Sequence, residues 1–97
     1  MAFIRKLRWD EWNAIHIARH NVTPEEVEDI CHNDPLVQVG KKGRKLVIGL
    51  TKEDRIITIV LDSEGPGKYY PVTARDASRK ERKLYNQEKE VQENEKK

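Results

Sequence analysis

The sequence predicts a single α+β domain, in which two N-terminal helices and one C-terminal helix pack on a small antiparallel sheet of β-meander type. Its 97 residues leave room for one hydrophobic core. The segment Thr23-Pro24-Glu25-Glu26 has the composition of a helix start with a capping box. Between residues 36 and 73, short β-branched runs alternate with turn signals, which favours three or four strands. We expect the helices on one face of the sheet, with the other face or an edge left open.

The N-terminal part predicts a short strand within residues 3–9 that leads into a helix. Asp10 is the expected N-cap of that helix, because a short acceptor side chain can bind the free N–H groups of the first turn. Asn21 tolerates the left-handed conformation, so the helix should end near His20.

The second helix is expected to begin at Pro24 and to end before Asn33-Asp34-Pro35. Proline is favourable at the first helical position, and the residue before a proline disfavours helical backbone. The residues that this helix should bury are Val27, Ile30 and Cys31.

Four strands are predicted next, over residues 36–39, 45–50, 56–61 and 68–73. The run 56–61 is apolar on both faces and rich in β-branched residues, so it should be the central strand. Pro71 has no N–H for a sheet ladder, which predicts an exposed side or a bulge in the last strand.

The C-terminal helix is expected to start at a second capping box, Ser78-x-x-Glu81, with Asp76 as a competing cap. The helix should carry Leu84 and Tyr85 inward. We expect one domain over residues 1–90 and a frayed, charged tail over residues 91–97.

Composition limits the function classes. Hydrophobic residues make up 36% of the chain and charged residues 37%, which predicts a thin core under a charged surface. No run approaches the roughly 20 apolar residues of a membrane span, and no apolar segment follows the N-terminal charges. We therefore expect a soluble, cytoplasmic protein. Cys31 is the only cysteine, which excludes an internal disulfide and a thiol cluster for zinc.

Charge is distributed unevenly around the small net value of +2. Residues 21–34 carry five acids and no lysine or arginine, whereas residues 35–60 carry six bases and two acids. Residues 75–83 hold five bases against two acids. Two basic zones in a small domain indicate a polyanion as partner, with a solvated surface as the alternative.

Several weak motifs together resemble the BrnT family of bacterial toxins, which have a RelE-type fold. They are Trp9-Asp10, Ala18-Arg19-His20, the segments 23–27 and 33–35, and Thr73-Ala74-Arg75-Asp76-Ala77-Ser78-Arg79-Lys80-Glu81-Arg82. The resemblance runs from about Trp9 to Tyr85. Pro71 departs from it, because an aliphatic residue is usual there.

The resemblance implies the toxin of a type II toxin–antitoxin system. Such a protein would be an endoribonuclease that inhibits growth, would act on RNA, including ribosome-associated mRNA, and would be neutralised by a cognate antitoxin protein. Contact with DNA would be indirect, through the antitoxin. The alternative is a nonenzymatic RelE-like module that binds antitoxin, RNA or ribosome. An autonomous DNA-binding protein is disfavoured, because the second helix is the most acidic of the chain.

RNA cleavage without a metal needs groups that move protons and cations that hold the phosphate. Histidine and arginine suit these roles. We therefore expect His20, Arg75 and Arg79 to be catalytic. A plain helix-capping role is the alternative for His20. The expected RNA-binding residues are Arg19, Arg44, Lys45, Arg82 and Tyr85.

Other side chains have simpler interpretations. Tyr85 can equally be a core tyrosine, and Arg44 and Lys45 can belong to a solvated hairpin. Trp9 and Trp12 are expected to build the core rather than to stack on bases. His16 and His20 are four residues apart, a spacing that suits two metal ligands, but no third ligand is evident, so we expect no metal and no cofactor.

Overall fold

The computed structural model of the protein describes the backbone of residues 4–95 and the side chains of residues 4–90. Five strands form one sheet in the order β1-β5-β4-β3-β2. The strands are β1 (Lys6–Leu7), β2 (Leu36–Val39), β3 (Lys45–Leu50), β4 (Ile56–Ser63) and β5 (Lys68–Asp76). The run that the sequence marks as most apolar, β4, is central, as predicted.

The expectation of a purely antiparallel meander is wrong. Strands β2 to β5 pair antiparallel, but β1 lies parallel to β5, with Lys6 opposite Lys68 and Leu7 opposite Tyr69. The sheet is therefore mixed. Two helices and three strands separate β1 from β5 in the sequence, so this pairing depends on long-range packing that no local pattern encodes.

The two N-terminal helices start at the predicted caps. Helix α1 (Glu11–Ala18) has Asp10 at its N-cap, and α2 (Pro24–His32) has Thr23 at its N-cap; both caps form complete capping boxes. Asn21 has a φ of 58°, which places it in the predicted left-handed conformation. Local sequence chemistry therefore fixes where both helices begin and where the first one is followed by a turn.

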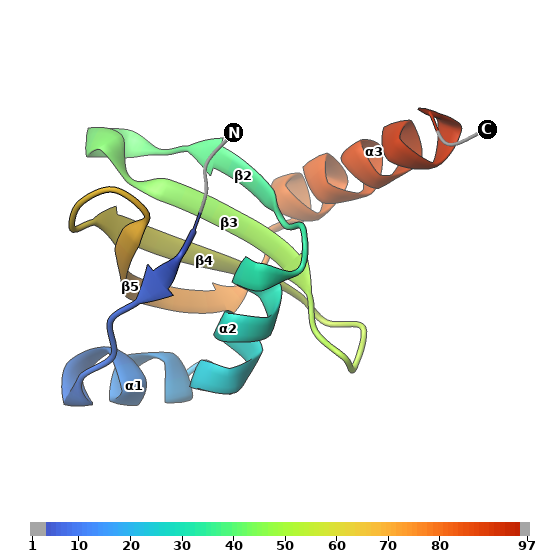
Figure 1. The fold of residues 1–97 in the computed structure, drawn as a ribbon. Coiled ribbons are helices and arrows are strands. Elements are labelled where there is room, and N and C mark those ends of the chain that lie inside the picture. Colours follow the sequence, from blue (N-terminus) through green and yellow to red (C-terminus); the bar gives the residue numbers. More distant parts are fainter. Residues whose placement is uncertain (1–3, 96–97) are drawn as a thin grey trace.

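Helices α1 and α2 cover one face of the sheet (Figure 1). Ile17 of α1 and Ile30 of α2 belong to the same hydrophobic cluster as Ile57, Ile59 and Leu61 of β4. These β4 side chains alternate along the strand and so share one face. The core of the domain is the layer between this face and the two helices.

Strand β5 is longer than residues 68–73 and continues to Asp76. The register between β4 and β5 shifts at Leu61, which pairs with Pro71, whereas Val60 pairs with Thr73. The bulge predicted at Pro71 is therefore present. Because the strand continues, Arg75 lies on the sheet rather than in the turn before the last helix.

Helix α3 (Arg79–Glu95) lies on the other side of the sheet and runs away from it (Figure 1). Thr58 alternates with Ile57 and Ile59, so its side chain is on the face opposite the core, and it donates a hydrogen bond to Glu81 of α3. The helices therefore do not all pack on one face. The backbone of α3 is helical through Glu95, and residues 96–97 of the expected tail lie outside the described residues.

The two tryptophans have different environments. Trp9 is half-buried and packs against the core, as expected. Trp12 is 83% exposed, so the expectation that it builds the core is wrong. It lies on the side of α1 opposite the buried Ile17, because the stripe that it shares with Ile15 faces away from the sheet core. No helix in the described part of the chain is long and apolar enough to cross a membrane.

Candidate functional site

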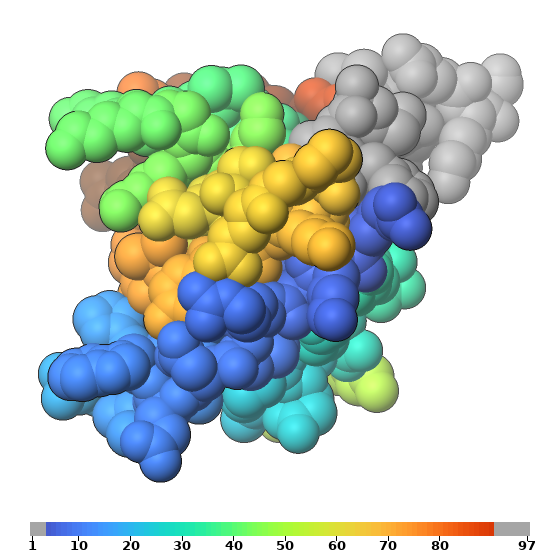
Figure 2. All heavy atoms as spheres, turned by 60° about the vertical axis from the view of Figure 1, so that its left-hand side comes forward, coloured from blue at the N-terminus to red at the C-terminus, as the bar shows by residue number. Residues whose placement is uncertain are grey.

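The face of the sheet opposite α1 and α2 is only partly covered. Its half-buried side chains, which we call the open sheet face, are Leu46, Val60, Asp62, Tyr70 and Thr73. They share this face because Leu46 pairs with Val60, Val60 with Thr73, and Asp62 with Tyr70. In Figure 2 the surface is hollowed between the green turn after β2 and the blue helix α1, with the orange strand β5 between them.

Arg75 projects beside the open sheet face at the end of β5. It pairs across the strands with Thr58, and its Nη1 and Nη2 atoms donate to the two carboxylate oxygens of Glu81 at 2.8 and 3.1 Å. Its side chain is 39% exposed, whereas that of Glu81 is 14% exposed. The guanidinium is thus held in one orientation while part of it still faces solvent.

Glu81 is the centre of this arrangement. Its Oε1 atom also accepts hydrogen bonds from Thr58 Oγ1 at 2.9 Å and from the backbone N–H of Ser78 at 2.7 Å. The hydrogen bond from Arg75 is the main cause that lowers the pKa of Glu81 to about 2, although partial burial opposes the shift. The carboxylate is therefore ionised at neutral pH. Its function is to position Arg75 and to cap α3, because such a weak base is a poor proton acceptor.

The other two arginines of the predicted group lie on the first turn of α3. Arg79 is the first residue of the helix and is exposed. Arg82 lines a separate pocket of about 470 Å³ with Asp54, Arg55 and Asp76, among others. Arg79 thus lies close in the chain to Arg75, because α3 begins three residues after the end of β5. Arg82 instead lies toward the β3–β4 hairpin.

His20 lies in the turn after α1. Its imidazole is exposed and lies 5.8 Å, between ring centroids, from that of His16. Its backbone oxygen accepts a hydrogen bond of 2.8 Å from Arg55, which also donates to Asp76 at 2.9 Å. The backbone of His20 is therefore tied to the residue that follows Arg75. In the described part of the chain, no hydrogen-bond partner is shared by the His20 imidazole and the Arg75 guanidinium.

Arg44 lies at the end of the open sheet face opposite to Arg75, whereas the side chain of Lys45 is on the other face of the sheet, because Lys45 alternates with Leu46 and pairs with the core residue Leu61. Arg44 Nε donates to Asp62 Oδ1 at 2.8 Å. Arg44 also lines a pocket of about 640 Å³ together with two apolar residues of the open sheet face and the exposed cations of the turn after β2. The other residues that line it are Val39, Gly40, Lys41, Lys42, Leu46 and Val60. Lys45, the first residue of β3, is half-buried and pairs with Leu61 of β4.

Tyr85 is 8% exposed and lies on α3, with the ammonium of Lys89 5.5 Å from its ring centroid. Burial is the main cause that raises its pKa. This placement agrees with the core alternative considered for this residue. A contact between Tyr85 and RNA would have to involve the small exposed part of the ring.

A second polar cluster was not predicted from the sequence. Arg8 lies over the ring of Tyr70 at 4.5 Å, and its Nε and Nη2 atoms donate to Glu64 at 2.8 and 2.7 Å. The Tyr70 hydroxyl donates to both carboxylate oxygens of Asp10 at 3.1 Å. Burial first, and then the Asp10 carboxylate, raise the pKa of Tyr70.

Only the capping role of Asp10 was visible in the sequence. The cluster joins β1, the start of α1, the β4–β5 loop and β5, so residues up to sixty positions apart meet in it. Every carboxylate in the cluster is paired, and Arg8 is 54% exposed at the side chain. It forms a rigid border of the open sheet face.

Among the side chains of residues 4–90, no group of three or more histidines, cysteines, aspartates or glutamates is arranged to hold a metal ion. The sequence matches no family model, and no curated protein matches it significantly.

Proposed function

We propose that this protein is the toxin of a type II toxin–antitoxin pair and that it is a metal-independent endoribonuclease. The observation that carries the proposal is the open sheet face, which is bordered by Arg75 at one end and by the basic turn around Arg44 at the other. A concave surface with cations at both ends suits a flexible polyanion. The resemblance of the sequence to BrnT-like toxins supplies the reaction class.

In this proposal Arg75 and Arg79 hold the phosphate and stabilise the charge that develops on it. Glu81 holds the Arg75 guanidinium in one orientation through both Nη atoms, so a phosphate would bind the part of this group that still faces solvent. The imidazole of His20 transfers a proton, which requires the exposed ring to turn around the outer edge of β5. Arg55 ties the His20 backbone to Asp76, the residue that follows Arg75, so the end of α1 is held next to the end of β5.

RNA would be bound outside the reaction centre by cations that remain accessible. Arg19, Arg44 and Arg82 serve this role in the proposal, whereas the half-buried Lys45 and the buried Tyr85 offer an RNA strand little accessible surface. A cognate antitoxin would neutralise the protein by covering the same surface.

One observation favours a second candidate, a nonenzymatic binding module. The candidate phosphate ligand Arg75 already has a bidentate carboxylate partner, which neutralises its charge. A surface of this kind can bind a protein or RNA partner without performing chemistry. The two candidates differ in whether RNA is cut.

Expression of the chain alone in a bacterium tests the first candidate. We expect growth arrest by the wild type, and we expect the purified protein to cut single-stranded RNA in the presence of EDTA. Arg79→Ala should lower the cleavage rate by roughly 100-fold and relieve the arrest, because one charge-stabilising group is lost. Lys52→Ala is the matched control, since Lys52 is 90% exposed and far along the chain from the site.

If the wild type and Arg79→Ala caused the same growth arrest, the proposed role of Arg79 as a phosphate ligand would be wrong. Binding of RNA without any cleavage would favour the binding module.

A further inference from the structure

Helix α1 carries an exposed aromatic and cationic stripe, of which the proposed function uses only Arg19. A pocket of about 380 Å³ on this side is lined by Glu11, Trp12, Ile15, His16 and Arg19. Trp12 is 83% and Ile15 57% exposed. Because most of the indole faces solvent, Trp12 contributes little to the core, and one aromatic face is accessible to a ligand.

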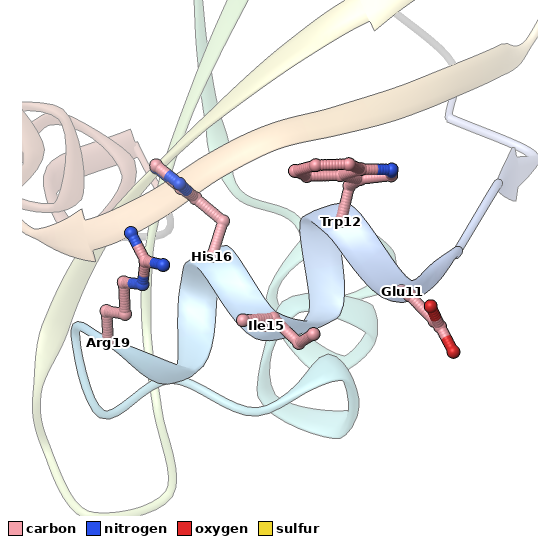
Figure 3. Close-up of a pocket in the computed structure, with 5 residues that line it drawn as sticks. All are labelled: Glu11, Trp12, Ile15, His16 and Arg19. Atoms are coloured by element: carbon pink, nitrogen blue, oxygen red, sulfur yellow. The ribbon is translucent and has the colours of Figure 1, made fainter.

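Three members of the stripe point the same way. Trp12 and Arg19 are seven residues apart, which is about two helical turns, and His16 lies between them. Figure 3 shows these three side chains on the side of α1 toward β5, whereas Glu11 points away from them. The ring of His16 is 5.8 Å from that of His20, so a second imidazole adjoins the stripe.

The charge of the stripe is complementary to a phosphate. The Arg19 guanidinium is exposed, and among the described residues it forms neither an ion pair nor a side-chain hydrogen bond. The carboxylate of Glu11, the one acid that lines the pocket, lies at the other end of the helix. The rise from Trp12 to Arg19 is about 10 Å, which leaves room for a base stacked on the indole and its adjoining phosphate at the guanidinium.

We propose that this stripe binds an unpaired nucleotide of single-stranded RNA, with a base stacked on Trp12 and its phosphate held by Arg19 and His16. A base can stack on an indole only when it is free of its neighbours, which selects single strands over duplex. Helix α1 borders the hollow surface that contains β5 (Figure 2), and the stripe is on its side toward β5 (Figure 3), so an RNA strand on the open sheet face can extend to it. This inference rests on the proposed function in that it assumes RNA as the ligand.

Binding is tested separately from cleavage. The probe is a short fluorescein-labelled 2′-O-methyl oligoadenylate, which lacks the 2′-hydroxyl nucleophile and cannot be cut through it. Fluorescence anisotropy gives Kd for the wild type, Trp12→Ala, Trp12→Phe and Arg19→Ala. Leu50→Ala is the control, because Leu50 is another exposed large apolar residue, 44% exposed, on the β3–β4 hairpin.

We expect Trp12→Ala to weaken binding about tenfold or more and Trp12→Phe to retain most of the affinity, because stacking needs an aromatic face. Arg19→Ala should reduce the slope of log Kd against log salt by about 0.7, the loss of one phosphate contact on a single strand. Leu50→Ala should bind as the wild type. The wild type should prefer the single strand to its duplex with oligouridylate.

Unchanged binding by Trp12→Ala would overturn the inference and would leave the stripe as a surface for a protein partner. Equal affinity for single strand and duplex would also overturn it. Circular dichroism confirms that each variant is folded, and the exposure of Trp12 makes loss of the fold an unexpected outcome.

The two proposals fail in different ways. If Trp12→Ala binds normally while the wild type cuts RNA, only the stripe assignment is wrong. If Trp12→Ala loses binding while the wild type cuts no RNA, the stripe assignment holds and the ribonuclease proposal is wrong.

Discussion

Glu81 shows how one residue serves both a helix and a functional side chain. The sequence predicts its role in the capping box with Ser78, and the structure adds its bonds to Arg75 and Thr58. The cap could be predicted because its partners are three residues apart. The Arg75 contact could not, because it depends on β5 continuing past Thr73 and presenting Arg75 on the side of the sheet that α3 covers.

Glu81→Gln should lower the free energy of unfolding at pH 7 by about 1–2 kcal/mol, allowing for solvent around the partly exposed Arg75. The pKa of Glu81 falls from 4.5 to about 2 on folding. The stabilisation of the fold by the ionised Glu81 carboxylate is therefore complete above about pH 4.5 and is lost as the pH falls toward 2. Urea unfolding at pH 7 and at pH 3 measures this, with exposed Glu88→Gln as the control. A difference between wild type and Glu81→Gln that is as large at pH 3 as at pH 7 would contradict the assignment.

Cys31 is a second residue with a checkable state. It is 6% exposed, and burial raises the pKa of its thiol to about 12. We expect no alkylation by iodoacetamide in the folded protein at pH 8, because the reactive thiolate is scarce and shielded. The same treatment in urea should modify it fully. Rapid modification of the folded protein would show that α2 opens readily.

At the scale of the elements, helix starts and strand positions follow from local chemistry. Asp10, Thr23 and Ser78 each form the predicted cap, and Asn21 and Pro71 produce the predicted turn and bulge. The wrong prediction at this scale is that all strands pair antiparallel. The parallel contact of β1 with β5 joins the two ends of the fold, and no periodicity within two residues of β1 could reveal it.

The contact between α2 and β3 depends on the absence of a side chain at Gly49. A Cβ at this position would overlap Cγ2 of Ile30, a stiff β-branched side chain with no free space to move into. We expect Gly49→Ala to destabilise the protein by about 1–3 kcal/mol in urea unfolding. In the double variant Gly49→Ala/Ile30→Ala, the loss of unfolding free energy should be smaller than the sum of the two single losses, because the smaller side chain at position 30 relieves the overlap. Strict additivity would contradict this packing.

At the scale of the whole molecule, Arg55 connects the turn after α1, which carries His20, to the end of β5, which carries Arg75. Its side chain is 29% exposed, and its guanidinium bridges the backbone oxygens of His20 and Asn21 and the carboxylate of Asp76. The end of α1 is thereby fixed against the end of β5. Its fork geometry is needed for this, since one planar group has to reach three acceptors.

Arg55→Ala should lower the free energy of unfolding by about 1–2 kcal/mol, because water can replace only part of these bonds. Arg55→Lys should restore less than half of the loss, since a single ammonium cannot bridge the three acceptors. Hydrogen exchange should speed up first at the end of α1. If Arg55→Lys restored the full free energy of unfolding, the positive charge alone would account for the stabilisation, and the bridge to three acceptors would not be needed.

The distribution of the helices also belongs to this scale. The molecule measures 44 × 29 × 22 Å, and α3 extends along its own direction away from the sheet (Figure 1). The sequence predicts this charged helix, but the expectation that it packs on the same face of the sheet as α1 and α2 is wrong. Thr58, which is buried on the face opposite the core, favours this placement of α3 because its hydroxyl donates to the Glu81 carboxylate.

The sequence by itself determined the class of fold, the positions of the caps and strands, the central place of β4 and the presence of two basic zones. All of these depend on residues that are close together in the chain or on composition. Only the tertiary structure decided that β1 closes the sheet in parallel, that Glu81 holds Arg75, and that Trp12 faces solvent. Each of these depends on which groups from distant segments compete for the same space and the same hydrogen bonds, and that competition is resolved only when the chain is folded.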